Sequence, residues 1–123
     1  MEFRDNEAIY LQIAGFVSEN IMLGKWPIGQ KIPSVRELAV ELQVNPNTVV
    51  RTYEFLQNRE VIANKRGIGF FATDNALEKI KSYRKERFLK QELPEFFRNI
   101  YLLNISLDEI ANRFEDFKNE NFK

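Results

Sequence analysis

The chain has 123 residues, of which 44% are hydrophobic, and its 18 basic and 18 acidic residues give a formal net charge of zero. This length suits one domain with an appendage and excludes two large domains. The sequence contains no cysteine and no histidine, which excludes disulfides, thiolate nucleophiles, zinc sites built from these residues and histidine-based catalysis. Catalysis by carboxylates alone stays open, but the acidic residues are spread along helical faces where solvated roles are expected. We therefore expect no enzyme, no catalytic residue, no cofactor and no metal site.

No segment of the chain indicates a membrane or secretion. No apolar run approaches the ~20 residues that a membrane-spanning helix requires. The first five residues are polar and acidic, unlike the basic and then apolar start of a secretory signal. We expect a cytoplasmic protein without a membrane partner.

The first predicted element is a helix of about four turns that follows Ala8. Asp5 or Asn6 would cap this helix, and Gly24 would end it. Its apolar stripe consists of Ile9, Ile13, Phe16, Val17 and Ile21. The stripe predicts an amphipathic helix with one side in the core.

Two short helices joined by a tight turn are predicted between residues 34 and 59. Ser34 and Glu37 have the spacing of a capping box, in which each side chain bonds the backbone N–H of the other residue. The first helix carries an apolar stripe formed by Val35, Leu38, Ala39 and Leu42. Asn45 is a strong N-cap for the second helix, and Pro46 is tolerated at its first position because the missing N–H would have no partner there.

The second helix, predicted over residues 45–58, has one packing face and one exposed face. The packing face holds Val49, Tyr53 and Leu56, and the opposite face holds Asn47, Val50, Arg51 and Glu54. A short helix, a turn and a second helix with polar side chains in its first turns form the layout of a helix-turn-helix, whose recognition helix meets base edges. The alternative is a helical corner in any small domain.

Beyond this helix the pattern becomes extended, and residues 61–73 are predicted to form a hairpin. Its loop contains two glycines and the adjacent cations Lys65 and Arg66, followed by Gly67, where a duplex backbone could lie. Alone, such a pair is a solvated turn, but directly after a helix-turn-helix it is typical of a wing. We expect residues 30–32 to add a short third strand beside the hairpin.

The remaining chain is predicted to be helical. A long helix begins at Ala76 after a cap by Asp74 or Asn75, and residues 79–90 form a basic run. The run is expected to be a solvated face, with extra contact to a DNA backbone as the alternative.

Two apolar helices close the chain. Pro94 is expected to kink or split the first of them, and Ser106 with Glu109 repeats the capping-box spacing before the second. Their apolar residues are Leu93, Phe96, Phe97, Ile100, Tyr101, Leu103, Leu107, Ile110, Ala111, Phe114 and Phe117. Two helices cannot bury both stripes against each other alone, so we expect a homodimer through these helices. The alternative is packing against the chain's own helix-turn-helix.

Three segments, residues 33–39, 44–49 and 66–71, together resemble the winged-helix domain of the GntR family of bacterial transcription regulators. The resemblance covers residues 8–73, and the short helical tail is similar to that of the YtrA subfamily, which has no large effector-binding domain. It implies that Arg36 meets DNA from the first helix of the motif. It also implies that the recognition-helix positions are Asn45, Asn47, Thr48 and Arg51 and that the wing tip is Arg66 and Gly67. Val50 departs from the family pattern, in which a polar or basic residue is common.

These observations predict a mainly α fold with a small β wing, in which a winged helix-turn-helix domain (residues 6–74) precedes a two-helix dimerisation region (residues 75–123). The predicted function is a dimeric repressor that binds a two-fold-symmetric operator in double-stranded DNA through the recognition helix and the wing. The predicted DNA-binding residues are Ser34, Arg36, Asn45, Asn47, Thr48, Arg51, Lys65, Arg66 and Gly67.

A net charge of zero is unlike a generic nucleic-acid binder, which is clearly basic. Affinity for phosphate depends, however, on the few cations within a Debye length of about 8–10 Å of the duplex, so their local placement decides. Two other functions remain alternatives, a winged-helix module for protein contact and a small-molecule-sensing adaptor with its site in the aromatic tail. The polar recognition face favours DNA over the first, and the shortage of polar groups in the tail disfavours the second.

Overall fold

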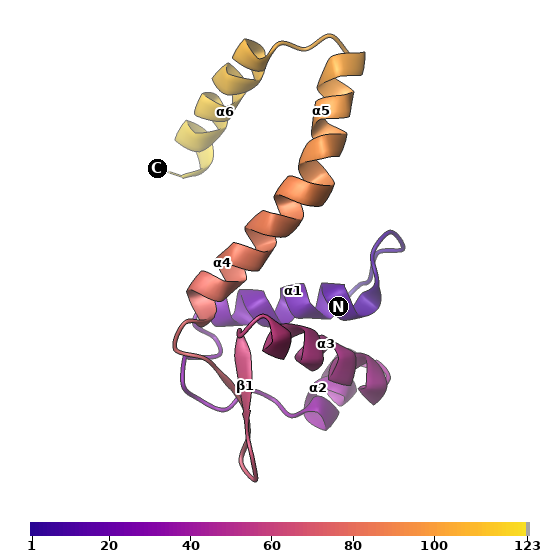
Figure 1. Cartoon of the computed structure of the whole chain (residues 1–123), viewed down its shortest axis with the longest axis vertical. Coiled ribbons are helices and arrows are strands. Elements are labelled where there is room, and N and C mark those ends of the chain that lie inside the picture. Colours follow the sequence, from indigo (N-terminus) through magenta and orange to yellow (C-terminus); the bar gives the residue numbers. More distant parts are fainter. Residues whose placement is uncertain (123) are drawn as a thin grey trace. The chain divides into compact units, whose positions relative to one another are not determined.

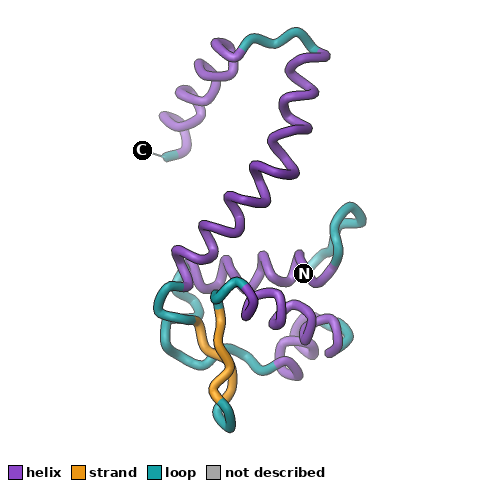
Figure 2. Tube along the Cα trace, viewed as in Figure 1, coloured by secondary structure: helices purple, strands orange, loops and turns teal. Residues whose placement is uncertain are grey.

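The computed structural model describes residues 1–122 (Figure 1). They form two compact units, of which the first is Met1–Arg84 and the second begins at Lys85. Helices dominate, and the only strands of the described residues form one hairpin (Figure 2). In chain order the elements are α1 (Ile9–Met22), α2 (Val35–Leu42), α3 (Pro46–Asn58), β1 (Ile62–Lys65), β2 (Gly69–Ala72), α4 (Ala76–Arg87), the π-helical turn η1 (Phe88–Glu92), α5 (Leu93–Leu102) and α6 (Leu107–Asn121).

The core of the first unit lies between α1, α2 and α3 and is closed by the hairpin and the start of α4. Its largest fully buried apolar side chains are those of Tyr53, Ile13, Ile32, Leu38, Leu56, Ile62 and Ile80. Ala76, Ile80 and Tyr83 of α4 belong to this core, and the Tyr83 hydroxyl shares a buried hydrogen bond of 2.6 Å with the Ser18 hydroxyl of α1. The core of the first unit therefore extends beyond residue 74, where the domain boundary was expected.

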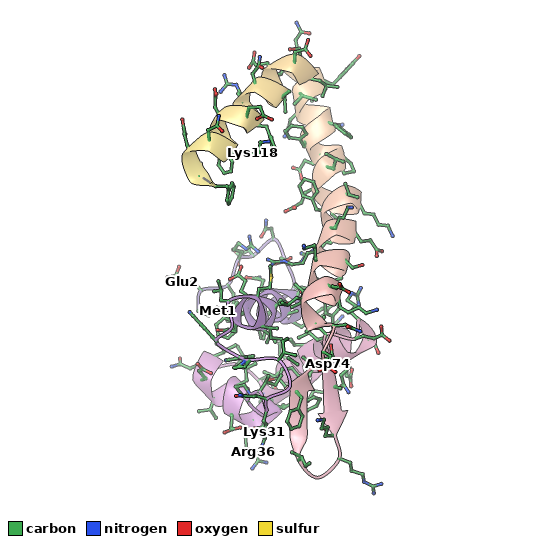
Figure 3. The ribbon with its side chains drawn as sticks, turned by 90° about the vertical axis from the view of Figure 1, so that its left-hand side faces the viewer. Met1, Glu2, Lys31, Arg36, Asp74 and Lys118 are labelled. Atoms are coloured by element: carbon green, nitrogen blue, oxygen red, sulfur yellow. The ribbon has the colours of Figure 1, made fainter. Side chains whose placement is uncertain are left out.

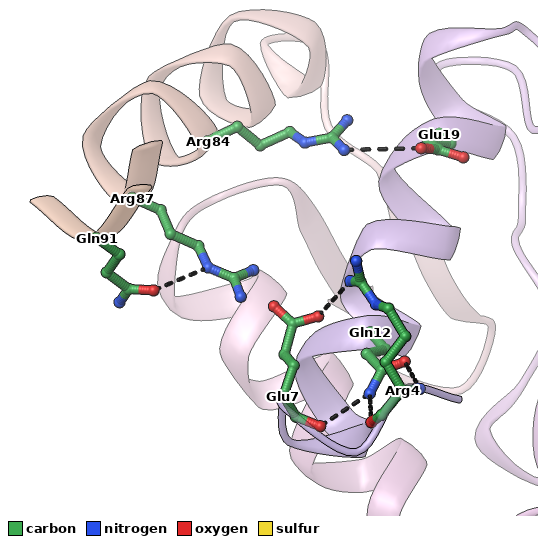
Figure 4. Close-up of polar contacts among 7 residues, drawn as sticks. All are labelled: Arg4, Glu7, Gln12, Glu19, Arg84, Arg87 and Gln91. Carbon is green, nitrogen blue, oxygen red and sulfur yellow. Dashed lines mark hydrogen bonds and ion pairs between the residues drawn. The ribbon is translucent and has the colours of Figure 1, made fainter. Parts of the chain in front are cut away.

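The chain before α1 is held by a buried glutamine and not by a helix cap. The N-cap of α1 is Ala8, which makes no side-chain capping bond, so the cap predicted at residues 5–6 is wrong. Gln12, 6% exposed, donates from its amide to the backbone oxygens of Arg4 and Glu7 and accepts from the Arg4 N–H, each at 2.8 Å (Figure 4). The side chain lies in the first turn of the helix and pairs three backbone groups of the preceding segment, which a helix cap would not pair.

The two helices of the helix-turn-helix begin as the sequence predicts. The Ser34 N–H donates to Glu37 Oε1 at 2.9 Å and the Glu37 N–H donates to Ser34 Oγ at 3.1 Å, which completes the capping box. Gln43, in the left-handed conformation with φ of 56°, ends α2. Asn45 then accepts the Asn47 N–H at 2.8 Å, and Pro46 is the first residue of α3.

We expect Ser34→Ala to lower the free energy of unfolding by about 1 kcal/mol, because the first turn of α2 loses its capping oxygen.

The backbone N–H of Ser34, then its hydroxyl, and the nearby Lys31 charge hold the pKa of Glu37 below its ordinary value of 4.5. A lowered folded-state pKa stabilises the fold above the ordinary value, and that contribution is lost as the pH falls through the lowered pKa. Ser34→Ala keeps the backbone N–H and removes only the hydroxyl's share of this effect. Urea unfolding near neutral pH and at about pH 3 should therefore show a slightly smaller difference between wild type and variant in acid. Ser34→Thr, which keeps a hydroxyl, is the control, and a variant as stable as wild type at neutral pH would contradict the capping role.

The hairpin pairs β1 and β2 antiparallel, with Ile62 opposite Ala72 and Lys65 opposite Gly69. Residues 30–32 lie beside the hairpin as predicted, but they do not form the predicted third strand. This segment makes one isolated bridge, between Lys31 and Phe71. It stays short because a turn at Gly29, with φ of 80°, precedes it and a proline follows it.

The second unit contains the predicted interruption at Pro94 in the form of a π-helical turn. Pro94 is the second residue of α5, and its missing N–H cannot bond the carbonyl four residues earlier. The turn just before it widens, and the Leu93 N–H bonds the Phe88 oxygen five residues back. No helix of the described residues is both long and apolar enough to cross a membrane.

The last helix, α6, has only half of the predicted capping box. The Glu109 N–H donates to Ser106 Oγ at 3.1 Å, as expected. The Glu109 carboxylate instead accepts from Arg113 Nε at 3.1 Å, one turn further along the helix. No side chain of α5 or α6 is buried.

Candidate nucleic-acid interface

The exposed face of α3 is the one that the sequence predicts. Val49, Tyr53 and Leu56 are buried in the core, whereas Asn47, Val50, Arg51 and Glu54 are exposed. Among the predicted contacts, Thr48 is half-buried beside this face, and Asn45 uses its side-chain oxygen as the helix cap. The first turns of α3 therefore offer amide, hydroxyl and guanidinium groups to a ligand, the chemistry that base edges require.

Arg51 does not extend freely from α3. Its guanidinium carbon lies 3.9 Å from the centre of the Tyr10 ring, in the first turn of α1. The neighbouring residue fixes the two helices together, because Thr52 Oγ1 donates to the Tyr10 backbone oxygen at 2.9 Å. Arg51 thus lies on the side of the recognition helix next to α1, which periodicity within α3 alone does not indicate.

The two predicted cations of the wing, Lys65 and Arg66, lie in different surroundings. Lys65 Nζ lies 4.5 Å from the centre of the Phe71 ring, so this cation is held over the hairpin strands. Arg66 and Gly67 are exposed in the loop that joins β1 to β2, where Gly67 has φ of 81° and serves the tight turn. Ile68 in the same loop is 59% exposed and adds an apolar side chain to the wing tip.

Two exposed cations lie at or before the start of α2. Arg36 is among the predicted DNA contacts, and Lys31 is not. Arg36 is exposed in the first turn of α2, and Ser34 is occupied by its capping box. Lys31 is exposed too, and Figure 3 shows both cations at the end of the first unit where the hairpin projects. The Lys31 side chain lies against Gly69, where an added Cβ would approach Lys31 Cε to 2.9 Å.

Lys31 could have been found from the alternation of its segment. Because successive side chains of an extended segment point to opposite sides, burial of Ile32 directs Lys31 to solvent. The segment lies beside β2, where the Ile32 N–H donates to the Phe70 oxygen at 2.9 Å. Lys31 is therefore a further candidate for phosphate contact between the wing and α2.

Tyr53 connects the three elements of this surface. Its hydroxyl donates to the Pro33 oxygen at 2.6 Å, just before α2, and its ring packs edge-on against Phe70 of the wing with 4.8 Å between centres. Burial raises the pKa of the Tyr53 hydroxyl, with smaller contributions from Glu37 and Glu41, so the group remains a donor. One buried side chain of the recognition helix thereby fixes the positions of α2 and the hairpin.

Comparisons with known proteins agree with this architecture. The family described as "Bacterial regulatory proteins, gntR family" matches residues 9–72. The chain is 30% identical to the HTH-type transcriptional regulator YhcF of Bacillus subtilis, over 94% of each chain. It is 31% identical to the HTH-type transcriptional repressor YtrA of the same organism, over 87% of this chain and 82% of that one. The structure is similar to a GntR-family regulator from Bacteroides thetaiotaomicron, with 51% identity, a TM-score of 0.79, and coverage of 92% of this chain and 98% of that one.

Proposed function

Because the chain belongs to the GntR family of bacterial regulatory proteins, we propose that it is a dimeric repressor that binds a two-fold-symmetric operator. Members of this family are DNA-binding transcription regulators and not enzymes. The observation that carries the proposal is the exposed face of α3, which presents polar and cationic side chains while the opposite, apolar face is buried in the core. The repressor role is supported by similarity to a relative that is itself named a repressor.

In the proposed complex, contacts to phosphate and contacts to bases come from different elements. Arg36, Lys31 and the N–H groups at the helix starts hold the DNA backbone, which sets the orientation of the protein. Asn47, Thr48 and Arg51, with Asn45 at the helix start, meet base edges in the major groove. Lys65, Arg66 and Gly67 follow the adjacent minor groove. Since this target is chromosomal DNA, we place the protein in the cytoplasm.

Dimerisation is proposed through α5 and α6. Neither helix buries a side chain, and large apolar groups remain exposed on both, including Phe97 (50%) and Tyr101 (85%) on α5 and Phe114 (57%) on α6. An apolar surface of this kind marks an interaction site. A second copy of the chain is the partner we propose, because a symmetric dimer presents two recognition helices to successive half-sites.

Selection of bound duplexes from a random DNA pool with the full chain tests this function. We expect enrichment of one inverted repeat, with half-site centres about 34 Å apart along the duplex. If no sequence is enriched, the winged helix does not read DNA by sequence, and a module for protein contact becomes the better interpretation.

Two arginine substitutions separate base readout from backbone attraction. We expect Arg51→Ala to lose about 1–3 kcal/mol of discrimination at one base pair, because it removes a bidentate fork. Arg66→Ala should weaken binding to all sequences alike and reduce the slope of log affinity against log salt by about 1. Titration of the selected fragment at several salt concentrations measures both effects. Lys25→Ala, which removes a positive charge from an exposed position outside α3, the wing and the dimerisation helices, is the control. Wild-type binding by both the Arg51 and the Arg66 variants would contradict the assignments.

A further inference from the structure

We propose that Tyr10 is a positioning residue for DNA recognition, which holds the Arg51 guanidinium so that its N–H edge faces a pair of acceptors on the duplex. This inference rests on the proposed function. The acceptor pair is either the O6 and N7 atoms of guanine or two oxygens of a phosphate, which share the geometry that a guanidinium fork fits.

The stack between Arg51 and Tyr10 leaves the arginine donors available. With 3.9 Å between the guanidinium carbon and the ring centre, the cation lies over the ring. Stacking uses the flat side of the guanidinium, whereas its N–H groups lie in the plane and point outward. No ion pair of the described residues involves Arg51, so no carboxylate competes for those donors.

Tyr10 is itself fixed to the core. Its backbone oxygen accepts from Thr52 Oγ1, and its ring packs edge-on against Phe55 with 6.0 Å between centres. Phe55 packs edge-on against Tyr83 at 5.6 Å, and the Tyr83 hydroxyl is hydrogen-bonded to Ser18 inside the core. A chain of packed aromatic rings thus supports the platform under Arg51. An arginine held in this way loses less conformational freedom when DNA binds than a free one would.

A second stacked arginine on the same helix supplies an internal comparison. The guanidinium carbon of Arg59, the C-cap of α3, lies over the Phe55 ring at 3.8 Å from its centre, nearly the same distance as in the first pair. Recognition helices contact bases through their N-terminal residues, which include Arg51 but not Arg59. The stack contributes to recognition only where it holds a cation at the reading end of the helix.

The test uses the full chain and a duplex fragment that the wild-type protein selects from a random pool. Tyr10→Leu removes the aromatic face, Tyr10→Phe keeps it, and Arg51→Lys keeps the charge without the planar fork. We expect Tyr10→Leu and Arg51→Lys each to weaken binding about 2- to 5-fold or more, the range that an exposed cation–π contact provides, and Tyr10→Phe to bind like wild type. In an Arg51→Ala background, Tyr10→Leu should cause no further loss. Arg59→Ala should bind like wild type.

The same titrations identify the acceptor. A loss confined to one base pair of the selected site assigns guanine, whereas a uniform loss with a smaller salt slope assigns phosphate, and both results support the positioning role. The proposal is overturned if Tyr10→Leu and Arg51→Lys bind like wild type, or if Tyr10→Leu weakens binding equally with and without Arg51. If the wild-type protein selects no fragment, the proposed function fails and this inference fails with it.

Discussion

A chain truncated after Arg84 is expected to be monomeric and to bind a two-fold operator about 10²–10⁴-fold more weakly than the full chain. The first unit keeps its complete core, because the buried residues of α4, Ala76 to Tyr83, remain present. The truncated chain loses the helices that link two DNA-binding units in a dimer, so binding at the second half-site is no longer intramolecular. Mass in solution and affinity for the selected fragment measure the two parts of this prediction.

Substitutions in the full chain separate the role of the apolar face from the role of chain length. Tyr101→Asp places a charge on the exposed apolar side of α5 and should dissociate the dimer. Asn99→Asp adds the same charge at an exposed polar position of the same helix and serves as the control. A truncated chain that stays dimeric, or a Tyr101→Asp variant that does, would assign the apolar face of α5 and α6 another partner.

Replacement of Tyr53 by alanine is expected to lower the free energy of unfolding by about 3–5 kcal/mol, the cost of removing a buried aromatic side chain. Tyr53 is 1% exposed, and its ring and hydroxyl contact the wing and the segment before α2. Tyr53→Phe removes only the hydroxyl and should cost about 1 kcal/mol or somewhat more, since the Pro33 oxygen loses its donor. Urea denaturation followed by circular dichroism gives both values.

Val40 on α2 is 74% exposed and provides the control for this prediction. Val40→Ala should change the stability by no more than about 0.5 kcal/mol, because it removes no buried contact. Losses of equal size in Tyr53→Phe and Tyr53→Ala would mean that the hydroxyl alone, and not ring packing, connects α3 to the wing.

Local patterns predicted the helix-turn-helix because its signals lie within a few residues of each other. The Ser34–Glu37 box, the Asn45 cap and the alternation of buried and exposed positions along α3 are all confirmed. The winged-helix fold and the family resemblance are confirmed as well. The caps and the helix faces depend on hydrogen bonds and periodicities that span about two helical turns, so they can be predicted from a short stretch of sequence.

Contacts between distant segments were not predictable in the same way. Nothing in the local pattern of α1 indicates that Tyr10 lies under Arg51, or that Gln12 holds the chain before the helix. No side chain caps α1, and Gln12 instead bonds backbone groups of Arg4 and Glu7, because a buried amide can donate and accept at once. The candidate contacts to DNA follow from position and family, and their roles stay predictions until the substitutions above are measured.

The cations that we propose as DNA contacts belong to a chain without net charge, and this affects how strongly the protein should bind unrelated DNA. Lys31, Arg36, Arg51, Lys65 and Arg66 are exposed on the first unit, while the whole chain sums to zero. Under the proposed function, a dimer brings on the order of ten such cations to DNA, so binding to unrelated sequence should fall steeply as the salt concentration rises. At cellular salt we then expect the base contacts of the recognition helix, and not the phosphate contacts, to decide which sites a small number of molecules occupies.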